Sequence, residues 1–146
     1  MTDDQREPAL TVGAEDAELG AYLGERLDAY NLEATGTTPD DLGELSVKAV
    51  DAEGALVGGL TASTWGGLLS VDMLWVREDS RHDGWGSRLL RAAETEARRR
   101  GCDRACVSSY TFQAPAFYER HGYVEKGRVP GVPGGAEDVY LYKEQL

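Results

Sequence analysis

The stretch Val76-Arg-Glu-Asp-Ser-Arg81-His-Asp-Gly84-Trp-Gly86-Ser-Arg-Leu-Leu90 joins the end of an apolar run to the start of an amphipathic helix pattern. Arg81, Gly84 and Gly86 form the pattern Arg-x-x-Gly-x-Gly within it. Glycines allow a backbone to approach a ligand closely, and the first N–H groups of a helix lie unpaired at its positive end. The stretch therefore predicts a phosphate-binding turn. The alternatives are an ordinary left-handed turn at the two glycines and a solvated cation at Arg81.

Two common phosphate motifs are absent from the sequence. The dinucleotide fingerprint Gly-x-Gly-x-x-Gly fails because Leu89 stands three positions after Gly86. A P-loop needs Gly-Lys-Ser or Gly-Lys-Thr, and neither occurs in the chain. The predicted phosphate-binding turn is therefore neither a dinucleotide fingerprint nor a P-loop, but another kind of strand-to-helix junction.

Apolar spacing predicts the secondary structure on both sides of this junction. Strands are predicted at 8–13, 45–50, 55–64, 68–76, 102–110, 123–129 and 138–144, and helices at 15–31, 86–100 and between Pro115 and Gly122. Loops are predicted at 31–41, with a short helical turn from Pro39, and at 130–136.

This order of elements indicates an α/β (α+β) fold. A strand, a helix and a second strand form a right-handed crossover, so strands 68–76 and 103–109 should be parallel. The whole order predicts a mixed, mostly antiparallel central sheet of six to seven strands with helices on both faces. The 146 residues suit a single domain, 1–146, with a loose start at 1–7.

Charges in the predicted helix 86–100 follow ion-pair spacing. Glu94 and Arg98 stand four residues apart, as do Glu96 and Arg100, and both pairs are expected to form. The basic run 98–100 suits the negative end of the helix dipole. We therefore interpret it as capping and not as a nucleic-acid contact.

Composition limits the partners and the location. The chain has 15 basic and 26 acidic residues, a net charge of −11, which disfavours nucleic acid and allows a cationic substrate. Solubility or adaptation to salt explains the same charge equally well. No segment is long and apolar enough to cross a membrane, and the N-terminus lacks a signal-peptide pattern, so we expect a cytoplasmic protein. Cys102 and Cys106 are expected to be buried free thiols, with no metal site.

Two motifs together carry a family resemblance. Arg81, Gly84 and Gly86 match all three fixed positions of the acetyl-CoA motif Gln/Arg-x-x-Gly-x-Gly/Ala, and the pair Phe117-Tyr118 with Gly122-Tyr123 matches a second signature beyond it. On these motifs the chain resembles the GNAT N-acetyltransferase superfamily over residues 8–145. The string from Ser109 to Tyr118 is similar to a small bacterial and archaeal subset whose substrate cannot be assigned. One departure is Thr111, where many members place an Asn.

The resemblance implies acetyl-CoA as co-substrate. Its pyrophosphate would bind the N–H groups of residues 82–87, and its pantetheine arm would pair with the strand backbone at Leu74 to Val76, in a gap between the splayed parallel strands. The implied cofactor-binding residues are Leu74, Val76, Arg81, His82, Asp83, Gly84, Trp85, Gly86, Ser87, Thr111, Ala114 and Phe117.

The implied reaction is direct attack of an amine on the thioester in a ternary complex. Tyr118 matches the position of the family's general acid, and its alternative is an aromatic core residue beside Phe117. Asp72, an acid inside an apolar strand, is the first candidate for the general base, although it is equally consistent with a strand acid at a polar edge. Glu33 is the second candidate. A backbone N–H near Val76 would stabilise the oxyanion.

Two functions remain open at this level. The first is transfer of an acetyl group from acetyl-CoA to a primary amine of a small molecule or peptide. The second is a non-catalytic acyl-CoA-binding or sensory module on the same fold. A homodimer is suggested only because members of the resembled family often form one. His82 and His121 are not assigned to catalysis.

Overall fold

The computed structural model describes residues 7–146, and the contacts within the chain divide it into two units, Met1–Pro39 and Asp40–Leu146. The first unit holds helix α1, Ala17–Thr35. The Asp16 carboxylate accepts a hydrogen bond from the Leu19 N–H at 2.9 Å, and Gly36 ends the helix with a φ of 66°. The helix runs past residue 31, its predicted end, because Gly36 is the first residue after it that favours a left-handed cap.

The strand predicted at 8–13 is wrong. These residues have no regular secondary structure and pair with no strand among residues 7–146. Alternating apolar residues favour an extended chain, but a strand also needs a neighbour for its N–H and C=O groups. Most of the loose start predicted at 1–7 lies outside the described residues.

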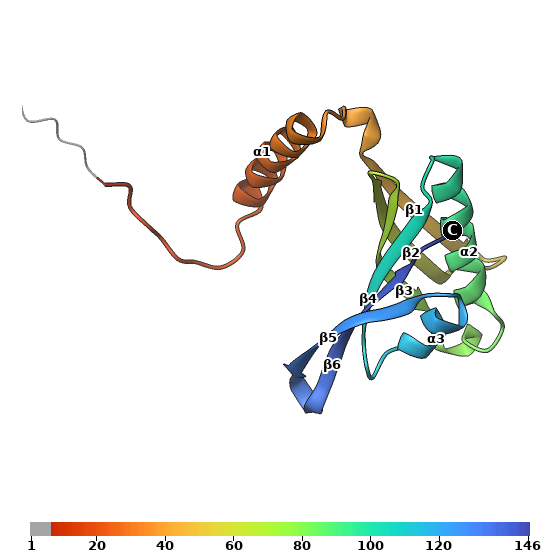
Figure 1. Ribbon diagram of the computed structural model, residues 1–146. Helices are drawn as coiled ribbons and strands as arrows, with labels where there is room; N and C mark the ends of the chain where they lie inside the picture. The colour runs from red at the N-terminus through yellow and green to blue at the C-terminus, as the bar shows by residue number, and fades with distance from the viewer. Residues whose placement is uncertain (1–6) are drawn as a thin grey trace, which may run out of the picture. The chain divides into compact units, whose positions relative to one another are not determined.

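The second unit is built on a six-stranded sheet (Figure 1). Its strands are β1 Gly43–Val50, β2 Leu56–Trp65, β3 Leu68–Val76, β4 Arg104–Tyr110, β5 Val124–Val132 and β6 Ala136–Lys143, in the order β1-β2-β3-β4-β6-β5. Only β3 and β4 are parallel, so the predicted mixed sheet with its parallel pair is confirmed. The helical turn predicted from Pro39 is present as Pro39–Asp41. The loop predicted at 130–136 is shorter, because β5 continues to Val132 and only Pro133–Gly135 turn.

The parallel pair separates soon after it begins. Leu68, Leu69 and Ser70 of β3 pair with residues 104–106 of β4, and no pairing follows. A bulge lies just beyond, because Thr61 of β2 faces Met73 while Ala62 faces Val71, which leaves Asp72 as the extra residue. A bulge bends a strand and increases its twist. The break in pairing and the bulge coincide where β3 and β4 diverge.

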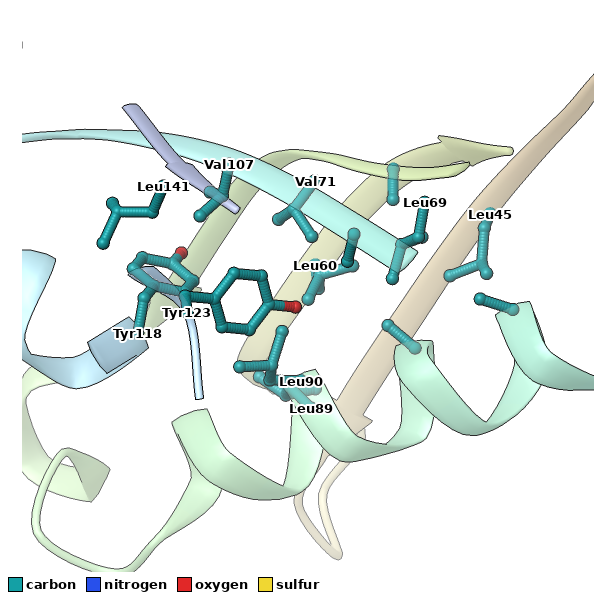
Figure 2. Packing of buried hydrophobic residues seen from close by; sticks show 14 of the residues in the cluster. Leu45, Leu60, Leu69, Val71, Leu89, Leu90, Val107, Tyr118, Tyr123 and Leu141 are labelled. Atoms are coloured by element: carbon teal, nitrogen blue, oxygen red, sulfur yellow. The ribbon is translucent and has the colours of Figure 1, made fainter. Parts of the chain in front are cut away.

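Helices α2, Trp85–Arg99, and α3, Pro115–Arg120, contribute to one buried cluster with the sheet. From α2 come Leu89, Leu90, Ala93 and Ala97, the apolar face expected from the sequence. Tyr118 of α3 and Tyr123 lie beside them, as Figure 2 shows. The two tyrosine rings are edge to face, with 5.7 Å between their centroids. None of the helices in residues 7–146 is long and apolar enough to span a membrane.

One predicted ion pair on α2 is replaced by a buried network. Glu94 is only 4% exposed and does not pair with Arg98. Its carboxylate accepts hydrogen bonds from the Tyr123 hydroxyl at 2.9 Å and from the Lys143 ammonium at 3.0 Å. Glu94 follows Leu90 by one helical turn and therefore faces the core. The predicted Glu96–Arg100 pair is confirmed at 3.0 Å.

The two cysteines are free thiols, as the sequence predicts. Cys102 is buried, whereas Cys106 is partly buried, with its sulfur 3.5 Å from the Ser70 hydroxyl oxygen.

A glycine in β2 lets α2 lie close to the sheet, and this generates the first prediction. A Cβ atom on Gly58 would lie 2.8 Å from the Trp75 carbonyl oxygen and 3.1 Å from the Leu89 side chain. Gly58→Ala should therefore lower the free energy of unfolding by about 1–3 kcal/mol, measured by urea denaturation. Gly127→Ala is the matched strand control, because nothing lies within 4 Å of its Cβ position. Equal stability of the two variants would contradict this packing.

Candidate active site

A cleft of about 820 Å³ lies where β3 and β4 have separated. Its two walls are residues 72–76 of β3 and residues 107–109 of β4. Arg81 and the start of α2 also line the cleft, and the lining is completed by Phe112, Gln113, Ala114, Phe117, Tyr118 and Arg120. The cleft therefore occupies the gap between splayed parallel strands that the resemblance implies.

Most of the predicted site residues meet in this cleft. Those that line it are Asp72, Leu74, Val76, Arg81, Gly84, Gly86, Ser87, Ala114, Phe117 and Tyr118. Those that do not are His82, Asp83, Trp85 and Thr111. Glu33 lies in α1, within the first unit.

Two of the residues outside the lining make contacts of their own. The Arg88 guanidinium lies over the Trp85 ring, 3.9 Å from its centroid. Thr111 exchanges two hydrogen bonds with Glu137, since its N–H donates to the Glu137 carbonyl at 2.9 Å and its hydroxyl accepts from the Glu137 N–H at 3.1 Å. Thr111 thus ties the end of β4 to β6.

The start of α2 has the features of an anion site. Gly84 is the N-cap residue, with a φ of 76° and no side-chain cap. Arg88 is the first residue of the helix whose N–H finds an acceptor, the Gly84 carbonyl at 3.1 Å. The N–H groups of residues 84–87 have no acceptor within residues 7–146, so they are free to bind an anion at the positive end of the helix.

Arg81 is not simply a solvated cation. Its Nε donates a hydrogen bond to the Val76 carbonyl at 3.0 Å. This contact fixes the end of β3 against the turn that leads into α2. Arg81 and Arg120 both line the cleft, and they bring positive charge to a chain whose net charge is −11.

The β3 backbone presents polar groups to the cleft. The Arg77 N–H donates to the Val57 carbonyl at 2.7 Å, which makes these two residues a hydrogen-bonded pair of the β2–β3 ladder. Such pairs alternate along antiparallel strands, so the N–H and C=O groups of Leu74 and Val76 point away from β2. They face the side from which β4 has separated, where an extended ligand can pair with them as an added strand.

Gly86 and Phe117 bring α2 and α3 together at the cleft. A Cβ atom on Gly86 would lie 3.4 Å from the Phe117 ring. The same ring packs edge to face on Tyr118, with 5.1 Å between centroids. The two family motifs therefore lie close together, and atoms beyond a Cβ at position 86 would crowd the Phe117 ring.

Tyr118 belongs both to the core and to the cleft. The residue is 6% exposed, and Figure 2 shows its ring among the buried side chains. Its hydroxyl makes no hydrogen bond to any of residues 7–146. Burial raises the pKa of Tyr118 to about 12. The hydroxyl therefore keeps its proton across the neutral range and can donate a hydrogen bond into the cleft.

Asp72 stands at the bulge of β3. Its side chain is exposed and lines the cleft. It forms no ion pair or hydrogen bond with residues 7–146. The carboxylate is therefore available to a ligand that enters this end of the cleft.

The sequence did not single out several lining residues. These are Met73, Trp75, Val107, Ser108, Ser109, Phe112, Gln113 and Arg120. Some of them shape the turn after β4, because the Ser109 hydroxyl accepts from the Ala114 N–H at 3.2 Å and the Gln113 side chain accepts from the Tyr110 N–H at 2.8 Å. The only signal that could have found them is adjacency to Asp72 or to the Phe117-Tyr118 motif.

Comparison with known proteins agrees with this geometry. Residues 14–123 match the acetyltransferase (GNAT) family. A blasticidin-S acetyltransferase of Streptomyces morookaense is 41% identical over 97 residues, covering 66% of this chain and 71% of the relative. An acetyltransferase of Agrobacterium fabrum is 34% identical over 128 residues, covering 88% and 92%. The crystal structure of a Bacillus cereus acetyltransferase superposes with a TM-score of 0.77 at 34% identity, covering 94% and 98%.

The match extends over the whole region that carries the cleft. Residues 14–123 include both motifs, the splayed strands and helices α2 and α3. The family and fold predicted from the two motifs are confirmed. The chain belongs to the GNAT acetyltransferase family and is an N-acetyltransferase.

Proposed function

We propose that the chain transfers an acetyl group from acetyl-CoA to a primary amine of a small molecule or peptide, by direct attack in a ternary complex. The observation that carries the proposal is that one cleft is lined by an unpaired helix start, by strand backbone that no neighbouring strand pairs, and by a largely buried tyrosine whose hydroxyl makes no hydrogen bond to residues 7–146. The similarity to a blasticidin-S acetyltransferase supports a small-molecule acceptor.

The residues present fit acetyl-CoA. The N–H groups at the start of α2 would bind the pyrophosphate, with Arg81 and Arg120 adding positive charge. The amide groups of the pantetheine arm would pair with the backbone of Leu74 and Val76. The thioester would then lie between β3 and Tyr118.

In the proposed reaction the amine nitrogen attacks the thioester carbonyl. A C–N bond forms, the carbonyl oxygen accepts a hydrogen bond from the Val76 N–H, and the C–S bond then breaks. A proton leaves the attacking amine for Asp72, directly or through water. The sulfur of CoA departs as a thiolate next to the Tyr118 hydroxyl.

Magnitudes favour a hydrogen bond from Tyr118 over complete proton transfer. The pKa of Tyr118 is about 12. A thiol has a pKa of about 8.5, so full transfer from Tyr118 would be uphill by about 5 kcal/mol. Tyr118 therefore acts chiefly by donating a hydrogen bond to the developing thiolate. The proton that finally neutralises the thiolate comes from solvent.

The proposal as a whole is tested by thiol release from acetyl-CoA in the presence of an amine panel. The panel contains polyamines, amino acids, aminoglycosides, lysine peptides and blasticidin S. Release that depends on one class of amine, with acetylated product found by mass spectrometry, supports the proposal. Binding of acetyl-CoA without turnover on any amine would contradict it and favour a sensory module.

Removal of the Tyr118 hydroxyl should slow turnover and leave cofactor binding intact. Tyr118→Phe retains the packed ring and removes only the donor to the thiolate. We expect kcat to fall about a hundredfold, with the dissociation constant of acetyl-CoA unchanged. Tyr140→Phe, on an exposed position of β6, is the matched control and should keep full activity. A Tyr118→Phe enzyme as fast as the control would remove Tyr118 from the mechanism.

The choice between the two candidate bases can be made from the pH dependence of kcat. Asp72→Asn should lower kcat at pH 7, because a lysine-like amine with a pKa of about 10.4 must lose a proton there before attack. The deficit should shrink as the pH rises toward the pKa of the acceptor. Glu33→Gln and the exposed Glu44→Gln serve as controls. A loss confined to Glu33→Gln would transfer the role to Glu33.

A larger side chain at the start of α2 should prevent cofactor binding. In Gly86→Val the Cγ methyl groups would crowd the ring of Phe117, which lines the cleft. We expect the affinity for acetyl-CoA to fall at least about tenfold, measured by calorimetry. Gly127→Val, at a site with nothing within 4 Å, is the matched control. Undiminished affinity in a folded Gly86→Val protein would place the pyrophosphate elsewhere.

A further inference from the structure

A histidine behind the cleft is bonded to the start of α2. The Ser87 hydroxyl oxygen and the His121 Nε2 lie 2.8 Å apart. Ser87 belongs to the first turn of α2 and lines the cleft, whereas His121 does not line it. His121 caps the C-terminus of α3, and its ring packs on Phe117 with 4.8 Å between centroids. The pair therefore joins the anion site on α2 to the helix that carries Tyr118.

This contact controls what the Ser87 hydroxyl can do, because a hydroxyl has one proton to donate. When Nε2 carries a lone pair, the hydroxyl donates to His121 and has no proton left for a ligand. When Nε2 carries a proton, the ring donates to Ser87, and the hydroxyl is free to donate into the cleft. The second arrangement lets Ser87 join the unpaired N–H groups of residues 84–87 in binding a phosphate oxygen.

We propose that His121 is a positioning residue for the phosphate site, which turns the Ser87 hydroxyl toward a bound phosphate and takes up a proton when acetyl-CoA binds. The inference rests on the proposed function, since it assumes that acetyl-CoA occupies this cleft. It adds a proton-linked step to cofactor binding, and it gives a role to a histidine at a variable position of the second motif.

The charges around His121 set the direction of the effect. Burial lowers the pKa of His121 below its usual value, and Arg91 of α2, Lys143 of β6 and Arg120 of α3 lower it further, whereas Glu94 of α2 raises it. The ring is therefore mainly neutral at pH 7 in the free protein, and the proposal assigns its one proton to Nδ1, so that Nε2 accepts from Ser87. A bound pyrophosphate would add negative charge next to Ser87 and favour the protonated ring. Between the two pKa values, binding takes up a proton, so affinity should fall as the pH rises.

The test measures acetyl-CoA binding to the full chain by calorimetry between pH 5.5 and 8.5, in buffers of different ionisation enthalpy. At pH 6, Ser87→Ala should weaken binding about tenfold, and His121→Phe, which keeps a ring against Phe117 but no longer orients the Ser87 hydroxyl, should also weaken it. At pH 8.5, where the wild-type ring is neutral, His121→Phe should bind no more weakly than the wild type, and at both pH values the double variant should be no weaker than Ser87→Ala alone. His121→Gln retains an N–H donor that cannot titrate. It should bind acetyl-CoA like the wild type at pH 6 and lose the wild-type proton uptake. Ser46→Ala, an exposed hydroxyl on β1, is the matched control.

A second readout does not depend on affinity. The His121 ring resonance, assigned by its loss in His121→Gln, should titrate at a higher pH in the acetyl-CoA complex than in the free protein. The shift should be smaller in Ser87→Ala. The phosphates of acetyl-CoA also titrate and contribute to the measured proton uptake. The contribution of His121 is therefore the proton uptake of the wild type minus that of His121→Gln.

The outcomes separate this inference from the proposed function. If the wild type binds no acetyl-CoA, the proposed function fails and this inference fails with it. If the wild type binds and turns over acetyl-CoA while Ser87→Ala binds as tightly and His121→Gln retains the full proton uptake, only the role of His121 is overturned.

Discussion

The early separation of β3 from β4 is the constraint on which the site depends. Parallel strands that stayed paired would use each other's N–H and C=O groups, and no ligand could reach them. Here pairing stops at Ser70, and the bulge at Asp72 follows directly. The remaining part of β3 pairs with a strand on one side only, β2, so no strand covers its other edge from Leu74 to Val76, where the Val76 carbonyl accepts from Arg81. The cleft is therefore a gap in the sheet itself, produced by the divergence of two main chains.

A gap of this kind needs support, which α2 and α3 supply through three contacts between distant parts of the chain. Gly86 admits the Phe117 ring, Ser87 bonds to His121, and buried Glu94 accepts hydrogen bonds from Tyr123 and Lys143. A buried carboxylate is stable only when its partners are in place. The Glu94 network thus fixes α2 relative to β6 and Tyr123, and the Tyr123 ring in turn packs on Tyr118. These contacts fix the proposed anion site on α2 and the Tyr118 ring in position relative to each other.

Features that depend on local geometry could be predicted from the sequence, and features that depend on tertiary contacts could not. Gly84 was identifiable because a turn with a φ of 76° excludes most other residues. The strand predicted at 8–13 failed because a ladder partner, not the residues themselves, decides whether a strand forms. The Glu94–Arg98 pair failed because four-residue spacing does not reveal which face of a helix is buried. Trp75, Arg120 and His121 stand beside or within recognised patterns, but their contacts at the site depend on distant segments meeting there, which local spacing does not reveal.

The two side chains of the proposed chemistry differ in burial, since Tyr118 is buried and Asp72 is exposed. At Tyr118 burial raises the pKa to about 12, which makes the hydroxyl a poor acid but lets it keep its proton across the neutral range. In a site of low polarity, a hydrogen bond from such a hydroxyl to a charged sulfur is stronger than the same bond in water. Asp72, in contrast, is exposed, as a group that exchanges protons with solvent between turnovers should be. The cleft is thus lined by a donor on α3 that keeps its proton and by an exposed carboxylate on β3, an arrangement suited to the proposed amine nucleophile and thiolate leaving group.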